Sequence, residues 1–109
     1  MATPTTIPVE VTSGAAAQIE ALGRWQEFEP MIEHTKQTVP KLDSIFVTRY
    51  EDPDDPEGSR ITIEARQHGS ESAVIMTLDE WGSWFVDTFR PEVRRSFGFT
   101  TSYRESHRR

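Results

Sequence analysis

The amino-acid sequence predicts an α+β fold, a two-layer sandwich with two helices on one face of a three-stranded, mainly antiparallel sheet. The chain of 109 residues has the length of one domain. Segments with a helical spacing of apolar residues and segments with strict alternation occur in the order α-β-β-α-β. Two helices suffice to cover only one face of such a sheet, which leaves the other face without a layer over it.

We expect the single domain to span residues 14–104. Residues 1–13 are rich in Thr and Pro, and the short apolar alternation of Ile7, Val9 and Val11 fits either an extended arm or a short strand. We favour a flexible or extended N-terminal arm. Residues 105–109 include two arginines and predict a basic C-terminal tail.

The first helix is expected to start at Ser13, because this residue precedes Gly14 and a run of three alanines, a pattern typical of an N-cap. The apolar residues before and after Pro30 fall on two different stripes, which predicts a kink or a restart at that proline. Pro40 is expected to end the element.

A β-hairpin is predicted next. Residues 43–50 are β-branched and aromatic, and residues 60–66 alternate strictly between apolar and polar. Between them, residues 51–58 are dense in Asp, Pro and Gly, which favours a tight connection. The carboxylates of this connection are spaced somewhat like those of a calcium loop, but the twelve-residue frame is missing, so we interpret it as a solvated turn and predict no metal site.

Residues from about Ser72 to Arg90 predict the second helix. At 100° per residue, a single stripe collects the large apolar side chains Val74, Leu78, Trp81, Phe85 and Phe89. The alternative is that residues 73–78 form a strand, with Thr77 and Glu80 as a capping box for a shorter helix, giving the order α-β-β-β-α. The apolar run lacks the alternation of a surface strand, which favours the helix.

The last strand is predicted after Pro91, where aromatic and small residues alternate from Arg95 to Tyr103. A right-handed crossover through the second helix would connect it to the preceding strand. Both helices then lie on the same face of the sheet.

Composition excludes several classes of chemistry. There is no cysteine, which removes disulfides, thiolate nucleophiles and Cys-ligated metals. The three histidines are far apart, no nucleophile elbow or phosphate-binding glycine loop occurs, and no cofactor is expected. No apolar run is long enough for a membrane span. These features predict a non-enzymatic, cytoplasmic protein without a membrane anchor. Ten of the twelve cationic residues are Arg, which favours a prokaryotic source.

The face of the sheet that the helices leave uncovered is the leading candidate for function. Alternation places Phe46, Tyr50, Arg60 and Arg66 on this face, and such a mixture of aromatic and Arg side chains is typical of partner contacts. We therefore predict an interaction or regulatory protein that acts through protein contacts, with self-association as a homodimer through this face.

The C-terminal segment offers an alternative, a single-stranded nucleic-acid-binding module. Residues 90–109 hold six arginines against two glutamates, whereas residues 1–89 hold six Lys or Arg against sixteen acidic residues. Aromatic rings could stack on bases and arginines could contact phosphates. The residues in question are Arg94, Arg95, Phe97, Phe99, Tyr103 and Arg104. The acidic remainder of the chain would repel a polyanion, which makes this the second hypothesis.

Overall fold

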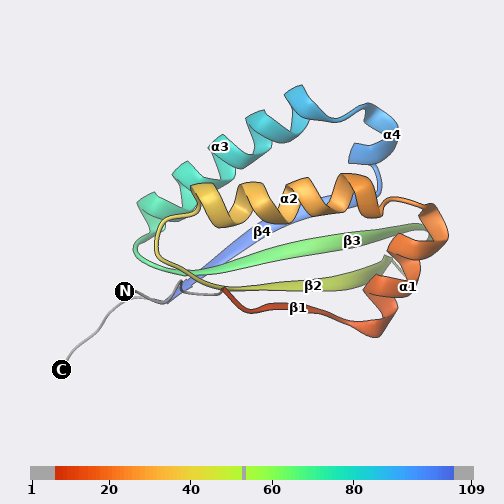
Figure 1. Cartoon of the computed structure of the whole chain (residues 1–109), viewed down its shortest axis with the longest axis horizontal. Coiled ribbons are helices and arrows are strands. Elements are labelled where there is room, and N and C mark those ends of the chain that lie inside the picture. Colours follow the sequence, from red (N-terminus) through yellow and green to blue (C-terminus); the bar gives the residue numbers. More distant parts are fainter. Residues whose placement is uncertain (1–6, 53, 105–109) are drawn as a thin grey trace, which may run out of the picture.

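The computed structural model describes residues 7–52 and 54–104, with side chains for all of these except residues 52, 55–59, 103 and 104. The elements follow one another as β1 (Val9–Val11), α1 (Ser13–Leu22), α2 (Trp25–Thr38), β2 (Leu42–Asp52), β3 (Asp55–His68), α3 (Glu71–Thr88), α4 (Pro91–Arg94) and β4 (Phe97–Arg104). The strands form one sheet in the order β1-β2-β3-β4. Helices α2 and α3 lie over the same face of it (Figure 1).

The α+β class with its helices on one face is confirmed, but the predicted three-stranded, mainly antiparallel sheet is wrong. In the described residues the sheet has four strands. The pairs β1–β2 and β3–β4 are parallel, and only β2–β3 is antiparallel. The additional strand comes from the segment interpreted as an arm, where Val9–Val11 pairs with Ile45–Val47. The alternative of a short strand is therefore the correct one, and so short an alternation does not distinguish it from an arm until the partner strand is known.

The first helical segment is broken at Gly23, whereas the sequence predicted a break at Pro30. Gly23 adopts φ 66°, the left-handed conformation that ends a helix, and its N–H donates to the carbonyl of Glu20. Pro30 lies inside α2, where it removes one backbone hydrogen bond without ending the helix. Helix α1 is capped by Thr12, one residue earlier than the predicted Ser13, through a hydrogen bond that its Oγ1 accepts from the N–H of Ala15.

The predicted helix over residues 72–90 is confirmed as α3, and the alternative strand at residues 73–78 is wrong. Ser70 caps α3 by accepting a hydrogen bond from the N–H of Ala73. Helix α3 is rotated about its own axis relative to the orientation that the apolar stripe predicted. Thr77 faces inward and is 7% exposed, whereas Leu78, predicted to be in the core, is 39% exposed.

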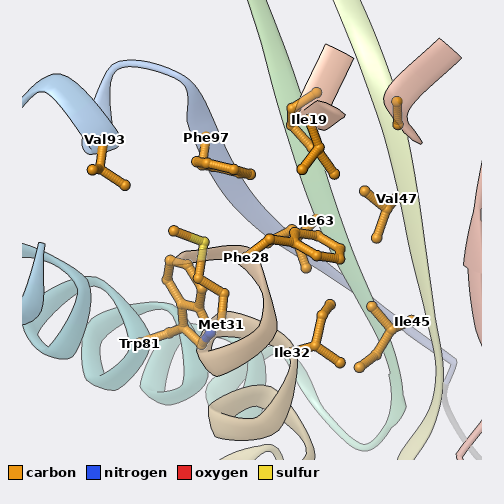
Figure 2. Close-up of a cluster of buried hydrophobic side chains, with 12 residues drawn as sticks. Ile19, Phe28, Met31, Ile32, Ile45, Val47, Ile63, Trp81, Val93 and Phe97 are labelled. Carbon is orange, nitrogen blue, oxygen red and sulfur yellow. The ribbon is translucent and has the colours of Figure 1, made fainter. Parts of the chain in front are cut away.

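The core lies between the sheet and helices α1 to α3 (Figure 2). Ile45, Val47, Ile61 and Ile63 from the central strands are at most 1% exposed, and Trp81 from α3 is equally buried. Each such side chain stabilises the fold by roughly 1.5–3 kcal/mol relative to exposure in water. The buried indole N–H of Trp81 donates to Thr35 Oγ1 of α2 at 2.9 Å, so this polar group is satisfied.

Candidate functional site

The side chains that point away from the helices form a continuous surface, here called the open face. Residues alternate along each strand, and the strand register brings the outward residues of β2, β3 and β4 side by side. No described helix covers this surface, since α2 and α3 both lie on the other side of the sheet (Figure 1). The open face consists of Ser44, Phe46, Thr48, Tyr50, Arg60, Thr62, Glu64, Arg66, Gly98, Thr100 and Ser102.

All four residues that the sequence assigned to the interaction surface lie on the open face. The guanidinium of Arg66 sits over the ring of Phe46, with 4.7 Å between its Cζ and the ring centroid. Tyr50 on β2 is directly opposite Arg60 on β3 in the antiparallel register. Tyr50 is 56% exposed, so most of its ring is accessible to another molecule.

Glu64 connects β3 to β4 and fixes Arg66, a role that the sequence did not reveal. Its Oε2 accepts a hydrogen bond of 2.9 Å from the hydroxyl of Ser102. Its Oε1 lies 3.4 Å from Nη2 of Arg66. Glu64 therefore contacts Arg66, whose guanidinium also lies over the ring of Phe46. Only the pairing of β3 with β4 brings Ser102 next to Glu64.

Close to the pair Thr48–Thr62, within two positions along β2 and β3, the open face has a regular order. On β2, an aromatic residue lies two positions away on each side, Phe46 and Tyr50. On β3, the residues two positions away are Arg60 and Glu64, which carry opposite charges. Under a two-fold rotation about the Thr48–Thr62 pair, these four positions bring aromatic residues opposite aromatic residues and opposite charges together.

The aromatic residues of the nucleic-acid hypothesis lie on the helix side of β4. Phe97 is 1% exposed, and the ring of Phe99 stacks on that of Trp81 with 4.2 Å between centroids. Phe97 is therefore covered by the protein's own core, and one face of the Phe99 ring is occupied by Trp81. Arg94 donates from Nε to the carbonyl of Phe89, and Arg95 is exposed. The side chains of Tyr103 and Arg104 lie outside the described residues.

His34 has a structural environment that its sequence neighbours did not indicate. Its ring stacks on Trp84 with 3.9 Å between centroids, and its Nε2 lies 3.2 Å from Oε1 of Glu80. These contacts join α2 to α3. Within residues 7–52 and 54–104, no group of three His, Asp or Glu side chains could hold a metal ion. Most carboxylates of the acidic turn, Asp52, Asp55 and Glu57, lie outside the described side chains.

Comparison with protein-family models, with curated proteins and with solved structures finds no match for this chain. Among the described helices, none is long and apolar enough to cross a membrane. The open face, with its exposed aromatic and charged side chains, is therefore the candidate functional site.

Proposed function

We propose that this protein is a non-enzymatic interaction protein that self-associates through the open face of its sheet. The supporting observation is the symmetric order of residues about Thr48 and Thr62, with opposite charges at Arg60 and Glu64. An interface between identical chains related by a two-fold axis must be complementary to itself, and this order meets that condition.

The symmetry defines how two copies would meet. A two-fold axis perpendicular to the strands, running along the Thr48–Thr62 pair, reverses the strand direction in the second copy. It places Phe46 opposite the partner's Tyr50, and Arg60 opposite the partner's Glu64. Packed sheets are separated by about 10 Å, a gap that side chains of these lengths fill from both sides.

The energetics favour this arrangement over one in which like charges meet. The interface between two copies contains two Arg–Glu pairs and two aromatic pairs, because the two-fold axis repeats every pair of residues. The Glu64–Ser102 hydrogen bond and the Arg66–Phe46 contact hold part of the surface in place before docking, which lowers the entropy lost on association. Threonines at the centre allow close approach of the two sheets.

A charge-reversal experiment tests the proposal. Sedimentation velocity over a concentration series would compare the wild type with Arg60→Glu, Glu64→Arg and the double variant. Each single reversal places like charges in both symmetric contacts, and we expect it to weaken association at least tenfold, or about 1.4 kcal/mol. The double variant restores opposite charges across the two-fold axis and should recover association.

Lys36→Glu is the matched control, because it makes the same change of charge on α2, away from the open face. It should leave the assembly unchanged. A wild type that sediments as a single chain at all concentrations would contradict the proposal. Equal weakening by Lys36→Glu, or a double variant no better than the single ones, would contradict it as well.

A further inference from the structure

A cleft on the helix side of the molecule lies between the last turn of α2 and the first half of α3. These two segments are neighbours at one end of the layer of helices (Figure 1). The cleft has a volume of about 280 Å³. Ligand sites start at roughly 300 Å³, so this cleft has the size for a small molecule. Its lining consists of Thr38, Pro40, Ala73, Met76, Thr77 and Glu80.

The hydroxyl group of Thr77 is left unpaired by the described fold. The side chain is 7% exposed, and its Oγ1 has no hydrogen-bond partner among the described residues. Threonines in helices often donate to the carbonyl four residues earlier, and Thr35 and Thr38 of α2 both do so. Thr77 does not. A buried hydroxyl without a partner destabilises a fold, so one in the wall of a cleft points to a bound molecule that completes its hydrogen bond.

Glu80 gives the cleft its charge. Among the described residues that line the cleft, it is the only charged one. Glu80 follows Thr77 by three positions, so the two side chains are neighbours on α3. Its Oε1 lies 3.2 Å from Nε2 of His34 on α2, which places the carboxylate where the two helices meet. The side chain is 52% exposed, so its Oε2 can accept a hydrogen bond from a bound molecule.

The end of α2 adds negative potential to the same cleft. Thr38 is the last residue of this helix, and Pro40 follows two residues later. The last carbonyls of a helix have no donor within the helix and carry partial negative charge, which favours a cation close to the last turn. The positive end of α3 is offset by Glu71 and capped by Ser70. The electrostatics of the cleft therefore favour a cation over an anion.

The remaining lining is apolar. Pro40, Ala73 and Met76 offer neither a charge nor a strong hydrogen-bonding group. Met76 is 70% exposed, and its unbranched side chain can adjust to ligands of different shape. An alkyl chain that lies against these three side chains removes apolar surface from water, which favours binding.

We propose that this cleft binds a small primary amine in its protonated form, carrying a short alkyl chain. An ammonium group has three donors. One donor pairs with the hydroxyl of Thr77 and a second with Oε2 of Glu80, while the alkyl chain covers Met76. Glu80 repels a carboxylate, and an alcohol lacks the charge that Glu80 attracts. The site lies on the helix side of the sheet, so it is independent of the open face and goes beyond the proposed self-association.

Methyl NMR of the full chain tests the site with three probes of one chain length, hexylammonium, hexanol and hexanoate. Hexylammonium should shift the methyl signals of Ala73 and Met76 in a saturable way. Hexanol should bind about fivefold more weakly because it is uncharged, and hexanoate should not shift these signals. Equal affinities of hexanol and hexylammonium, or no saturable shift below about 10 mM hexylammonium, would overturn the proposal.

Substitutions separate the contributions of the hydroxyl and the carboxylate. Thr77→Val keeps the shape of the side chain and should weaken hexylammonium binding about tenfold, because a hydrogen bond from a charged donor is lost. Glu80→Gln keeps an oxygen that can accept from His34 but removes the charge, and it should reduce the affinity for hexylammonium to that for hexanol. Asp79→Asn is the matched control, because it removes the same charge from a side chain that lines a different groove of α3. Equal weakening by Asp79→Asn would refute the assigned role of Glu80.

Thermal unfolding gives an independent measurement on Thr77. Because its hydroxyl makes no hydrogen bond within the described fold, Thr77→Val should not lower the thermal midpoint of the protein without a ligand. Hexylammonium should raise the midpoint of the wild type more than that of Thr77→Val, because it binds the wild type more tightly. A lower midpoint of the ligand-free variant would show that the hydroxyl is already paired inside the fold, and this outcome would overturn the proposal.

Discussion

Replacing Thr35 by Val should destabilise the protein strongly although it removes a single hydroxyl group. Thr35 is fully buried, and its Oγ1 accepts the indole N–H of Trp81 at 2.9 Å while donating to the carbonyl of Met31 at 2.7 Å. Valine has nearly the same shape, so little packing is lost. The N–H of Trp81, itself 1% exposed, is left without an acceptor, which costs about 1–3 kcal/mol.

Thermal unfolding measured by circular dichroism gives the assay. At roughly 4–8 °C per kcal/mol for a domain near this size, the midpoint should fall by about 10 °C. Thr38→Val is the control, because Thr38 makes the same type of hydrogen bond, 2.7 Å to the carbonyl of His34, at an exposed position. Its effect should stay within about 0.5 kcal/mol. Equal effects of the two substitutions would refute the assigned role of the Thr35–Trp81 hydrogen bond.

Three further outcomes follow from individual residues. Gly23→Ala should cost about 1 kcal/mol in urea unfolding, because Gly23 has φ 66° and ends α1; no loss would mean that the turn relaxes. Glu92 should titrate by NMR below the ordinary glutamate range, because its own backbone N–H and then Arg90 and Arg95 lower its pKa. Because this pKa is lowered, Glu92 stabilises the fold at pH values above its unfolded-state pKa, and this stabilisation is lost as the pH falls through its folded-state pKa. Glu92→Gln should abolish this pH dependence of stability. A titration midpoint of Glu92 within the ordinary glutamate range would contradict the prediction. Single-stranded oligonucleotides should show no anisotropy change at low salt, because the rings of Phe97 and Phe99 are covered; binding weakened by substitution of Arg95 would contradict this.

The sequence was sufficient for the elements with long, regular patterns. Helix α3 followed from apolar spacing over eighteen residues, and the β2–β3 pair followed from strict alternation. The same alternation placed Phe46, Tyr50, Arg60 and Arg66 on one face. Side chains along a strand alternate between the two faces of the sheet, so one residue assigned to the correct face fixes the faces of the others.

Features that depend on contacts between residues far apart in the sequence could not be predicted from it. Strand β1 exists because Val9–Val11 meets β2, and three residues carry too little pattern to distinguish a short strand from an extended arm. The rotation of α3, with Thr77 buried and Leu78 exposed, is set by how α2 and β4 contact it together. The break at Gly23 required weighing a left-handed glycine against a proline that a helix can tolerate.

Glu64 illustrates the same limit within the candidate site. Its position on the open face followed from alternation, but its hydrogen bond to Ser102 depends on the parallel register of β3 and β4. The self-complementary order about Thr48 and Thr62 likewise requires the antiparallel register of β2 and β3. Residues that share a face can be recognised in a sequence, whereas their order across strands needs the fold.

Cross-linking through a single introduced cysteine tests self-association at the open face most directly, because the native chain contains none. Thr48→Cys lies on the proposed two-fold axis, so a bismaleimide that spans roughly the 10 Å between packed sheets should join two chains rapidly. Lys36→Cys, on α2, should not cross-link at the same protein concentration. Covalent pairs formed by Thr48→Cys alone would support face-to-face docking, and equal yields from both variants, or none from Thr48→Cys, would contradict it.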